Sequence, residues 1–280
     1  MPERVQDAER LARALATLLG PAAARIEPRK LADGIGHASY LVTLAEQSYV
    51  LKLKHGPAPA ILTLEEEFAL LEAAAAAGIT AEPLRMDSAT DAMLIRFVPR
   101  ARSLTEAVTR ESANISRLAA LLHRLHGMAA PLRDFEPRGH AENYLSAAAR
   151  WAPLTPREQG MAKELRTLAA DYATRYPPSA VCHNDLVAAN VLDTGELVLV
   201  DFEYAARAAP ILDLASLAAM NAYTENDRRK LLSAYYGGSA APVSPAELAD
   251  VVRLVQLITY FWALALPAQL RAQNARYLRV

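Results

Sequence analysis

The chain has 280 residues, of which 52% are apolar and 22% charged, a balance typical of globular rather than disordered proteins. Thirty Lys and Arg against 31 Asp and Glu give a formal charge of −1, without the basic excess of a nucleic-acid binder. The only cysteine, Cys182, excludes an intrachain disulfide and a multi-cysteine metal site. No apolar run reaches the ~18 residues of a membrane span and no signal-peptide core is found, so we expect a cytoplasmic protein without membrane insertion.

The first part of the chain mixes helical and strand-like patterns. Apolar residues recur at helical spacing over residues 5–19, and Gly20-Pro21 ends that helix. Strands are expected at residues 25–31, 39–45, 47–53 and 92–98. A helix is expected from about residue 62 to 77, ending at Gly78, a good C-cap residue.

After Pro99 and a polar stretch, the pattern becomes mainly helical. Helical periodicity covers residues 104–110, 112–126, 140–150, 157–175, 211–222, 227–236 and 245–266. One strand-rich stretch, residues 180–202, interrupts it. A small strand-rich part followed by a larger helical part predicts an α+β fold with two domains, residues 1–98 and 99–280.

The segment from Val181 to Ala205, VCHNDLVAANVLDTGELVLVDFEYA, contains the residues of chemical interest. If Thr194-Gly195 forms a two-residue turn between strands, Asn190 and Asp201 converge at the open end of the hairpin. A carboxylate and an amide oxygen brought together suit a hard cation such as Mg²⁺. Asp185, in the loop before the hairpin, can reach the same cleft.

The pattern His183-x-Asp185-x-x-x-x-Asn190 followed by Asp201-Phe202-Glu203 resembles the catalytic loop and metal-binding segment of protein-kinase-like phosphotransferases. The strings CHNDLVAANVL and VDFEYAARAAPILDLAS resemble more specifically bacterial choline and ethanolamine kinases, within the aminoglycoside-phosphotransferase-like superfamily. This resemblance implies a two-lobed fold with a small antiparallel-sheet N-lobe and a larger, mostly helical C-lobe. It also implies ATP and Mg²⁺ as cofactors, with ATP bound between the lobes.

When the motif is matched residue by residue, the resemblance implies that Asp185 is the base that accepts the proton of the substrate hydroxyl. It also implies that Asn190 and Asp201 are the magnesium ligands. His183 would brace the catalytic loop, and Asp213 would tie that loop to the following helix. On the residues alone, a short His-x-Asp pattern arises by chance and Asp or Asn beside a hairpin is often turn chemistry. The second Asp and the DFEYA and DLA strings make the pattern specific.

The first part of the chain supplies candidate ATP-binding residues. Gly34 and Gly36 lie between two expected strands, where glycines let backbone amides approach phosphates, although such turns are often plain hairpins. The string GIGHASY departs from the paired glycines and Asn that the resembling family carries, which puts the phosphate contacts of this loop in doubt.

Lys52 interrupts an apolar strand, so it needs a negative partner unless it is an edge lysine that reaches solvent. The resemblance implies phosphate oxygens and a helix glutamate. Glu67 shares a helical face with Leu70 and Leu71 and is preferred, with Glu66 as the alternative. The resemblance further implies that Phe97 and Val98 belong to the segment whose backbone meets adenine.

The acceptor is less well specified than the phosphate donor. Choline kinases bind a quaternary ammonium with aromatic faces and carboxylates, so Glu203, Tyr204 and Trp262 are pocket candidates, although Trp262 could equally be core. Tyr223 and Trp151 are weaker candidates. We expect a small, cationic alcohol such as choline or ethanolamine, with thiamine, a sugar or an aminoglycoside as alternatives.

Two charge features bear on that choice. Eukaryotic choline kinases place an acidic residue shortly after the DLA-like segment, where this chain has Met220-Asn221. From residue 211 onward there are five acids and seven Lys or Arg, which suits a polycationic aminoglycoside poorly.

Two functions of other classes stay open. One is a catalytically silent nucleotide-binding protein. The other is a metallohydrolase with His183, Asp185 and Asp201 as ligands, which leaves Lys52 and the glycine turn unexplained. The sequence leaves the oligomeric state open.

Overall fold

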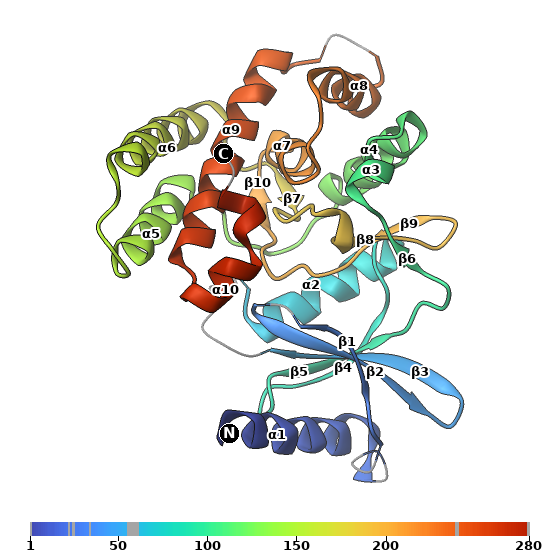
Figure 1. The fold of residues 1–280 in the computed structure, drawn as a ribbon. Helices are drawn as coiled ribbons and strands as arrows, with labels where there is room; N and C mark the ends of the chain where they lie inside the picture. Colours follow the sequence, from blue (N-terminus) through green and yellow to red (C-terminus); the bar gives the residue numbers. More distant parts are fainter. Residues whose placement is uncertain are drawn as a thin grey trace. The chain divides into compact units, whose positions relative to one another are not determined.

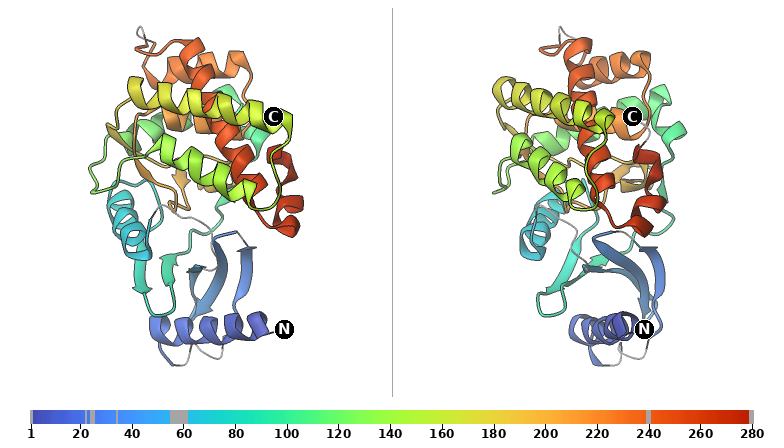
Figure 2. Two further views of the ribbon diagram at one scale, coloured as in Figure 1. Left: turned by 90° about the vertical axis from the view of Figure 1, so that its left-hand side faces the viewer. Right: turned by 60° about the vertical axis from the view of Figure 1, so that its left-hand side comes forward.

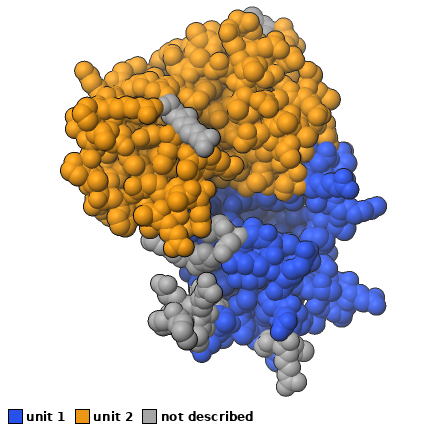
Figure 3. Space-filling model, viewed as in Figure 1, with its two compact units in different colours: residues 1–102, 192–205 blue, residues 103–191, 206–280 orange. Residues whose placement is uncertain are grey.

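The computed structural model describes residues 2–21, 23, 26–33, 35–54, 62–238 and 241–278. The chain forms two compact units, coloured separately in Figure 3: unit 1 holds residues 1–102 and 192–205, and unit 2 holds residues 103–191 and 206–280. The expected division after residue 98 assigns residues 192–205 to the second domain, whereas the structure groups them with unit 1. The reason is local, because the Leu199 amide donates to the Ile79 carbonyl at 2.8 Å and the Leu62 amide donates to the Glu203 carbonyl at 3.2 Å.

Unit 1 is built on an antiparallel five-stranded sheet in the order β1-β2-β3-β5-β4 (Figure 1). Its strands are β1 (Arg29–Asp33), β2 (His37–Leu44), β3 (Gln47–Lys54), β4 (Pro83–Asp87) and β5 (Ala92–Arg96). β2 and β3 pair along their whole length, with Ser39 opposite Lys52. Ala45 and Glu46 join them with φ of 48° and 68°, the left-handed pair of a tight two-residue hairpin turn.

Two helices cover opposite faces of this sheet. Leu51 and Leu53 of β3 point to one face, where they pack in a core cluster with Leu15 and Leu18 of α1 (Pro2–Leu19). Lys52, between them in the strand, points to the other face, toward α2 (Leu64–Ala76). One strand thereby supplies core on one side and a charged group on the other.

The start of α2 is fixed by a capping box. The Thr63 hydroxyl accepts from the Glu66 amide at 3.2 Å, and the Glu66 carboxylate accepts from the Thr63 amide at 2.9 Å. Glu66 is thereby used at the helix end. Glu67, one residue further on, is 1% exposed and faces the sheet.

Unit 2 is mostly helical. Its helices are α3 (Glu106–Thr109), α4 (Ser112–His126), α5 (Pro137–Ala149), α6 (Pro156–Arg175), α7 (Ile211–Met220), α8 (Glu225–Tyr235), α9 (Pro245–Ala265) and α10 (Ala268–Gln273). Short 3-10 helices form at η2 (Ala188–Asn190) and η3 (Ala275–Leu278). Helices α5, α6, α7 and α8 all pack on α9 (Figures 1 and 2).

Short strands complete the fold. β7 (Ala180–Cys182) pairs antiparallel with β10 (Ala206–Ala208). β6 (Arg102–Ser103), β8 (Val191–Asp193) and β9 (Leu197–Leu199) form a three-stranded sheet in the order β6-β8-β9. The two residues that follow β7 begin the candidate catalytic loop, so the β7–β10 pair fixes where that loop starts.

Helix α9 corrects one expectation from the sequence. An 18-residue window within Pro245–Ala265 has a mean hydropathy of 1.5, so by length and composition this helix could cross a membrane, contrary to the expected absence of such a run. Half of the window is buried inside the protein, and Arg253 pairs with Glu164 of α6 at 2.7 Å. A helix that packs against α5, α6, α7 and α8 needs a broad apolar surface, which accounts for the composition.

Candidate functional site

The first part of the site is an ion-pair cluster in unit 1. The Lys52 ammonium lies 2.7 Å from Glu67 Oε1 and 2.6 Å from Asp201 Oδ1. Lys54, two residues along the same strand face, lies 2.9 Å from Glu67 Oε2. Of the two glutamates considered from the sequence, Glu67 therefore pairs with Lys52 and Glu66 caps the helix. Two candidates far apart in the sequence, Lys52 and Asp201, are brought together.

Burial and charge act in opposite directions on this cluster. Lys52 is 4% exposed, and burial alone disfavours its charged form, but the carboxylates of Asp201 and Glu67 outweigh this and raise its pKa. Burial also disfavours the Glu67 carboxylate, yet the ammonium groups of Lys52 and Lys54 outweigh it and lower the pKa of Glu67. Both groups are therefore charged at neutral pH.

His37 is a member of this cluster that the sequence analysis missed. It is the first residue of β2, and its ring lies between two carboxylates, with Nε2 3.7 Å from Asp201 Oδ2 and Nδ1 3.5 Å from Glu203 Oε2. The signal was present in the string GIGHASY, whose histidine stands where the resembling family carries a different pattern. Gly34 lies outside the described residues, and Gly36 lies directly before His37.

The second part of the site is the loop 183–190 in unit 2. Asn190 lies at the end of η2, and its side-chain amide nitrogen donates to Asp185 Oδ2 at 2.9 Å and to the Asp185 carbonyl at 3.0 Å. The other polar atom of the Asn190 side chain is its amide oxygen. His183 is fully buried, and its Nδ1 accepts from the Asp185 amide at 3.3 Å. Asp185 is thus held from both sides of the loop.

Asp213 anchors this loop from α7. Its Oδ2 accepts from the His183 amide and its Oδ1 from the Asn184 amide, both at 2.8 Å. Asn184 has φ of 64°, a conformation that Asn tolerates better than most residues, and the Asp213 carboxylate holds it there. The predicted link between Asp213 and the loop is thus made through two main-chain amides.

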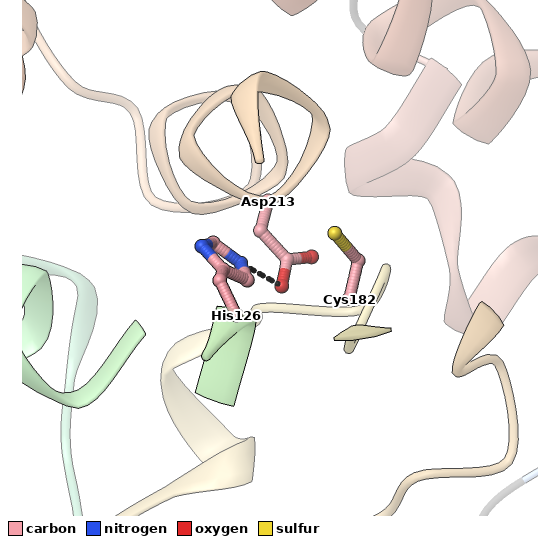
Figure 4. Close-up of side chains that lie close together, drawn as sticks. All are labelled: His126, Cys182 and Asp213. Atoms are coloured by element: carbon pink, nitrogen blue, oxygen red, sulfur yellow. Dashed lines mark hydrogen bonds and ion pairs between the residues drawn. The ribbon is translucent and has the colours of Figure 1, made fainter. Parts of the chain in front are cut away.

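A histidine that the sequence analysis did not single out completes this network. His126, the last residue of α4, places Nε2 3.1 Å from Asp213 Oδ2 and Nδ1 2.7 Å from the Tyr235 hydroxyl of α8. Figure 4 shows Asp213 pointing from α7 toward His126, with Cys182 of β7 beside it. Burial disfavours the Asp213 carboxylate, but the hydrogen bond and charge of His126 outweigh it and lower the pKa of Asp213.

His126, Cys182 and Asp213 lie close enough to hold a metal ion, but their polar atoms are already used. Asp213 has three hydrogen-bond partners and His126 has two. The Cys182 thiol lies 3.8 Å from the Ala209 carbonyl, and burial raises its pKa well above the ordinary value, which disfavours the thiolate a metal needs. This group is a structural network.

The predicted hairpin turn is wrong in detail. β8 and β9 are joined by three residues, Thr194–Glu196, and the Thr194 amide donates to the Glu196 carbonyl at 2.9 Å. The Asp193 carboxylate accepts from the Gly195 amide, which stabilises this wider loop in place of the two-residue turn. Asn190, moreover, ends a 3-10 helix and not a strand. The register argument that joined Asn190 to Asp201 therefore fails as stated.

The two residues expected to meet adenine, Phe97 and Val98, follow directly after β5. The Phe97 amide donates to the Ser48 carbonyl at 3.4 Å, and Phe97 and Val98 are both half-buried. The Val98 carbonyl accepts from the Ala101 amide at 3.5 Å, which turns the chain after β5.

The candidate acceptor residues have different surroundings. In unit 1, Glu203 is 6% exposed and faces His37, while Tyr204 is half-buried. In unit 2, half-buried Trp262 packs edge-on to Tyr277 of η3, with ring centroids 5.7 Å apart. Burial raises the pKa of Tyr277 against the opposing charge of Arg276, and the charges of Asp185 and Glu106 contribute in the same direction as burial. Tyr277, which the sequence analysis did not single out, therefore lies within the electrostatic reach of Asp185.

The two weaker candidates have structural roles. The Tyr223 hydroxyl is buried and donates to the Thr109 carbonyl at 2.6 Å. Trp151 is exposed and its indole nitrogen donates to the Ala265 carbonyl at 2.7 Å.

The two predicted magnesium ligands lie in different units. Asp201 offers a carboxylate, and its backbone φ of 67° is unusual for a residue other than glycine. The Asn190 amide oxygen is the second candidate ligand. Oxygen donors of these two kinds are what Mg²⁺ prefers.

The comparisons with known proteins all match the chain to phosphotransferases. Residues 27–251 match the model of the phosphotransferase enzyme family. Among curated proteins, Protein LicA of Haemophilus influenzae is 22% identical over 192 residues, which are 66% of this chain and 55% of that protein. The match thus spans about half the length of this curated relative.

Solved structures show the same fold at low identity. Choline kinase LicA from Streptococcus pneumoniae superposes with a TM-score of 0.77 at 19% identity, covering 95% of each chain. A choline/ethanolamine kinase family protein from Mesorhizobium loti gives 0.75 at 23% identity, covering 98% of this chain and 95% of that one. Spectinomycin phosphotransferase, solved with ADP and spectinomycin, gives 0.66 at 15% identity, covering 91% and 89%.

Proposed function

Because this chain belongs to the phosphotransferase enzyme family, we propose that it transfers the terminal phosphoryl group of ATP to the hydroxyl of a small cationic alcohol of the choline or ethanolamine type. The observation that carries the proposal is the anchored catalytic loop, in which Asp185 is held by Asn190 and His183 while Asp213 fixes the backbone beneath it. A phosphoryl transfer needs such positioning more than it needs covalent chemistry.

Each residue has a role in this proposal. Asp185 orients the acceptor hydroxyl and takes its proton, and the Asn190 amide keeps the carboxylate in place. Lys52, positioned by Glu67, contacts the phosphates of ATP. Asn190 and Asp201 hold Mg²⁺, which would neutralise charge on the phosphate oxygens. The ADP in the spectinomycin phosphotransferase structure supports a nucleotide as the donor.

The choice of acceptor rests on the surroundings of Trp262 and on the relatives. Arg276 already lies over the Tyr277 ring, 4.5 Å from its centroid, so we assign the cation of the substrate to the ring of Trp262. Two of the superposed structures are named as a choline kinase and a choline/ethanolamine kinase family protein. Thiamine, sugars and aminoglycosides are alternatives, and the spectinomycin enzyme shares the fold.

A purified-enzyme screen tests the acceptor. We expect ADP release with Mg²⁺-ATP to rise most with choline or ethanolamine, and less with thiamine, sugars and aminoglycosides. If no alcohol stimulates release above the rate with water, the protein is a nucleotide binder without transferase activity. If spectinomycin or another aminoglycoside is preferred, the choline-type assignment is wrong and the phosphotransferase assignment stands.

Trp262→Ala tests the aromatic pocket. Loss of one cation–π contact and of packing should raise KM for the preferred cationic alcohol by about tenfold, with KM for ATP nearly unchanged. Trp151→Ala is the matched control, because Trp151 is the other tryptophan of the chain and its ring is exposed. Equal effects of the two substitutions on KM for the alcohol would contradict the assignment.

A further inference from the structure

The cluster of His37, Asp201 and Glu203 in unit 1 has more polar capacity than its contacts use. His37 and Glu203 are 8% and 6% exposed, so both are buried from water. Within the described residues, His37 Nδ1 and Glu203 Oε2 make no hydrogen bond, although they face each other. Burying two such atoms without partners costs free energy, so a ligand that satisfies both would be stabilised there.

The spacing fits ligands of a shared ion better than a hydrogen bond. His37 Nδ1 and Glu203 Oε2 are 3.5 Å apart, beyond the usual N–H···O range of about 2.7–3.2 Å. Two donors bound about 2.1 Å from one ion lie roughly 3–3.5 Å apart. One ligand atom from each of the three side chains lies within 4.8 Å of the other two. One imidazole nitrogen binds a given ion, so His37 Nδ1 and Glu203 Oε2 would hold it, and the Asp201 carboxylate would turn toward it as the third ligand.

The charges of the side chains in and around this cluster also favour a bound cation. Three carboxylates, of Glu67, Asp201 and Glu203, face two ammonium groups, of Lys52 and Lys54. The Lys52 ammonium donates to Asp201 Oδ1, whereas Asp201 Oδ2 faces the His37 ring. With a neutral imidazole, the form that binds a metal, the cluster keeps an excess of one negative charge, which favours a bound cation.

We propose that His37, Glu203 and Asp201 bind a first-row transition-metal dication such as Mn²⁺, next to the magnesium that Asp201 holds in the proposed function. The imidazole decides the class of metal, since Mg²⁺ and Ca²⁺ favour oxygen ligands whereas transition metals accept nitrogen. The proposal rests on the proposed function only in sharing Asp201. The proposal also assigns a function to His37, the histidine of the string GIGHASY.

Electron paramagnetic resonance with Mn²⁺ alone tests the site on the full-length chain. Titration of free Mn²⁺ gives the affinity, and pulsed measurements on protein labelled with ¹⁵N-histidine detect a nitrogen bound to the ion. We expect histidine coupling in the wild type and its loss in His37→Asn and in His37→Gln. Glu203→Gln should weaken Mn²⁺ binding by at least about tenfold.

His123→Asn is the matched control, because His123 is exposed and belongs to unit 2. It should keep both the coupling and the affinity. Absence of histidine coupling in the wild type, or its persistence in folded His37 variants, would overturn the proposal and leave His37 as an ion-pair partner of the two carboxylates. Because the readout needs no turnover, a protein that binds Mn²⁺ through His37 but transfers no phosphate would contradict the proposed function alone.

Discussion

At the residue scale, the arrangement around Lys52 is the most informative. An ammonium group 4% exposed is stable only because two carboxylates lie within 2.7 Å of it. The alternation of β3 puts Lys52 and Lys54 on the same face, where Lys52 contacts both Glu67 and Asp201 and Lys54 contacts Glu67. Position along the strand, not the charge alone, therefore distinguishes the two lysines.

This distinction predicts different effects of two similar substitutions. Lys52→Met should reduce kcat/KM for ATP by about 100-fold or more, because the proposed phosphate contact is lost. It should also lower the free energy of unfolding by about 3 kcal/mol, since the carboxylate partners lose a buried counter-charge. Steady-state kinetics and urea unfolding measure the two effects.

Lys54→Met is the control for that experiment. It removes an ammonium group from the same strand face and from the same partner, Glu67, but leaves the Asp201 contact intact. Activity should stay within a few fold of the wild type. Equal loss of kcat/KM in both variants would show that the charge of the cluster matters and that the specific contact of Lys52 does not.

At the element scale, three helices converge on the candidate catalytic loop, residues 183–190. The Tyr235 hydroxyl of α8 bonds to His126 of α4, His126 bonds to Asp213 of α7, and Asp213 holds the amides of His183 and Asn184. A change in α8 can therefore alter the position of Asp185 without touching it. Tyr235 is a positioning residue in this account.

Tyr235→Phe tests the connection with the loss of a single hydroxyl. We expect kcat to fall severalfold with KM for ATP unchanged, because the loop shifts while the nucleotide contacts remain. Stability should fall by about 1 kcal/mol, the value of one hydrogen bond. Tyr236→Phe, at the C-cap residue directly after α8, is the control and should change neither quantity. A Tyr235→Phe enzyme with wild-type kcat would contradict the positioning role.

Helix α5 predicts a pH dependence of stability. Burial lowers the pKa of His140 from 6.5 to about 4, and its ring packs against Phe135 and Tyr144. Between pH 4 and 6.5 the unfolded chain binds the proton and the folded chain does not, so stability rises with pH across this window and is lost as the pH falls. The full effect is at most about 3 kcal/mol.

His140→Phe should remove this contribution while keeping an aromatic ring in place. Urea unfolding at pH 4.5 and pH 7 should show a smaller difference for the variant than for the wild type. His123→Phe, at an exposed position, should leave the difference unchanged. An unchanged difference in His140→Phe would contradict the assignment.

The elements show which patterns a sequence can disclose. Helices with a marked apolar face were predicted to within a few residues, as in α4 (Ser112–His126) and α9 (Pro245–Ala265). β4 (Pro83–Asp87) and β10 (Ala206–Ala208) were missed because they are short and partly polar, and pairing with neighbours defines them. The wider loop at Thr194–Glu196 depends on an Asp193 side-chain bond that periodicity does not contain.

The residues of the candidate site also differ in whether local sequence patterns can predict their contacts. The resemblance implied a helix glutamate as the partner of Lys52, and helix spacing, a local rule, favoured Glu67 over Glu66. His37, His126 and Tyr277 could not, because each acquires its partners from elements far away in the sequence. The charge requirement of Lys52 suggested that such partners exist, without identifying Asp201 among them.

At the scale of the whole molecule, the chain combines an antiparallel-sheet unit and a helical unit, each with its own part of the proposed site. Lys52, Glu67, Asp201 and His37 belong to unit 1, and Asp185, Asn190 and Asp213 to unit 2. This division matches the α+β, kinase-like fold that the superposed structures share. The proposed phosphoryl transfer requires both units, so an isolated unit should be inactive.

The most direct test of the central claim is the transfer of labelled phosphate from γ-³²P-ATP to choline or ethanolamine by the wild type and Asp185→Asn. The asparagine keeps the size of the side chain and its contact with Asn190 but removes the base. We predict labelled phosphoalcohol from the wild type and a rate about 10²–10⁴-fold lower for the variant, with ATP binding retained. Equal rates in the two proteins would contradict the role of Asp185, and no labelled product with any alcohol would contradict the proposed function.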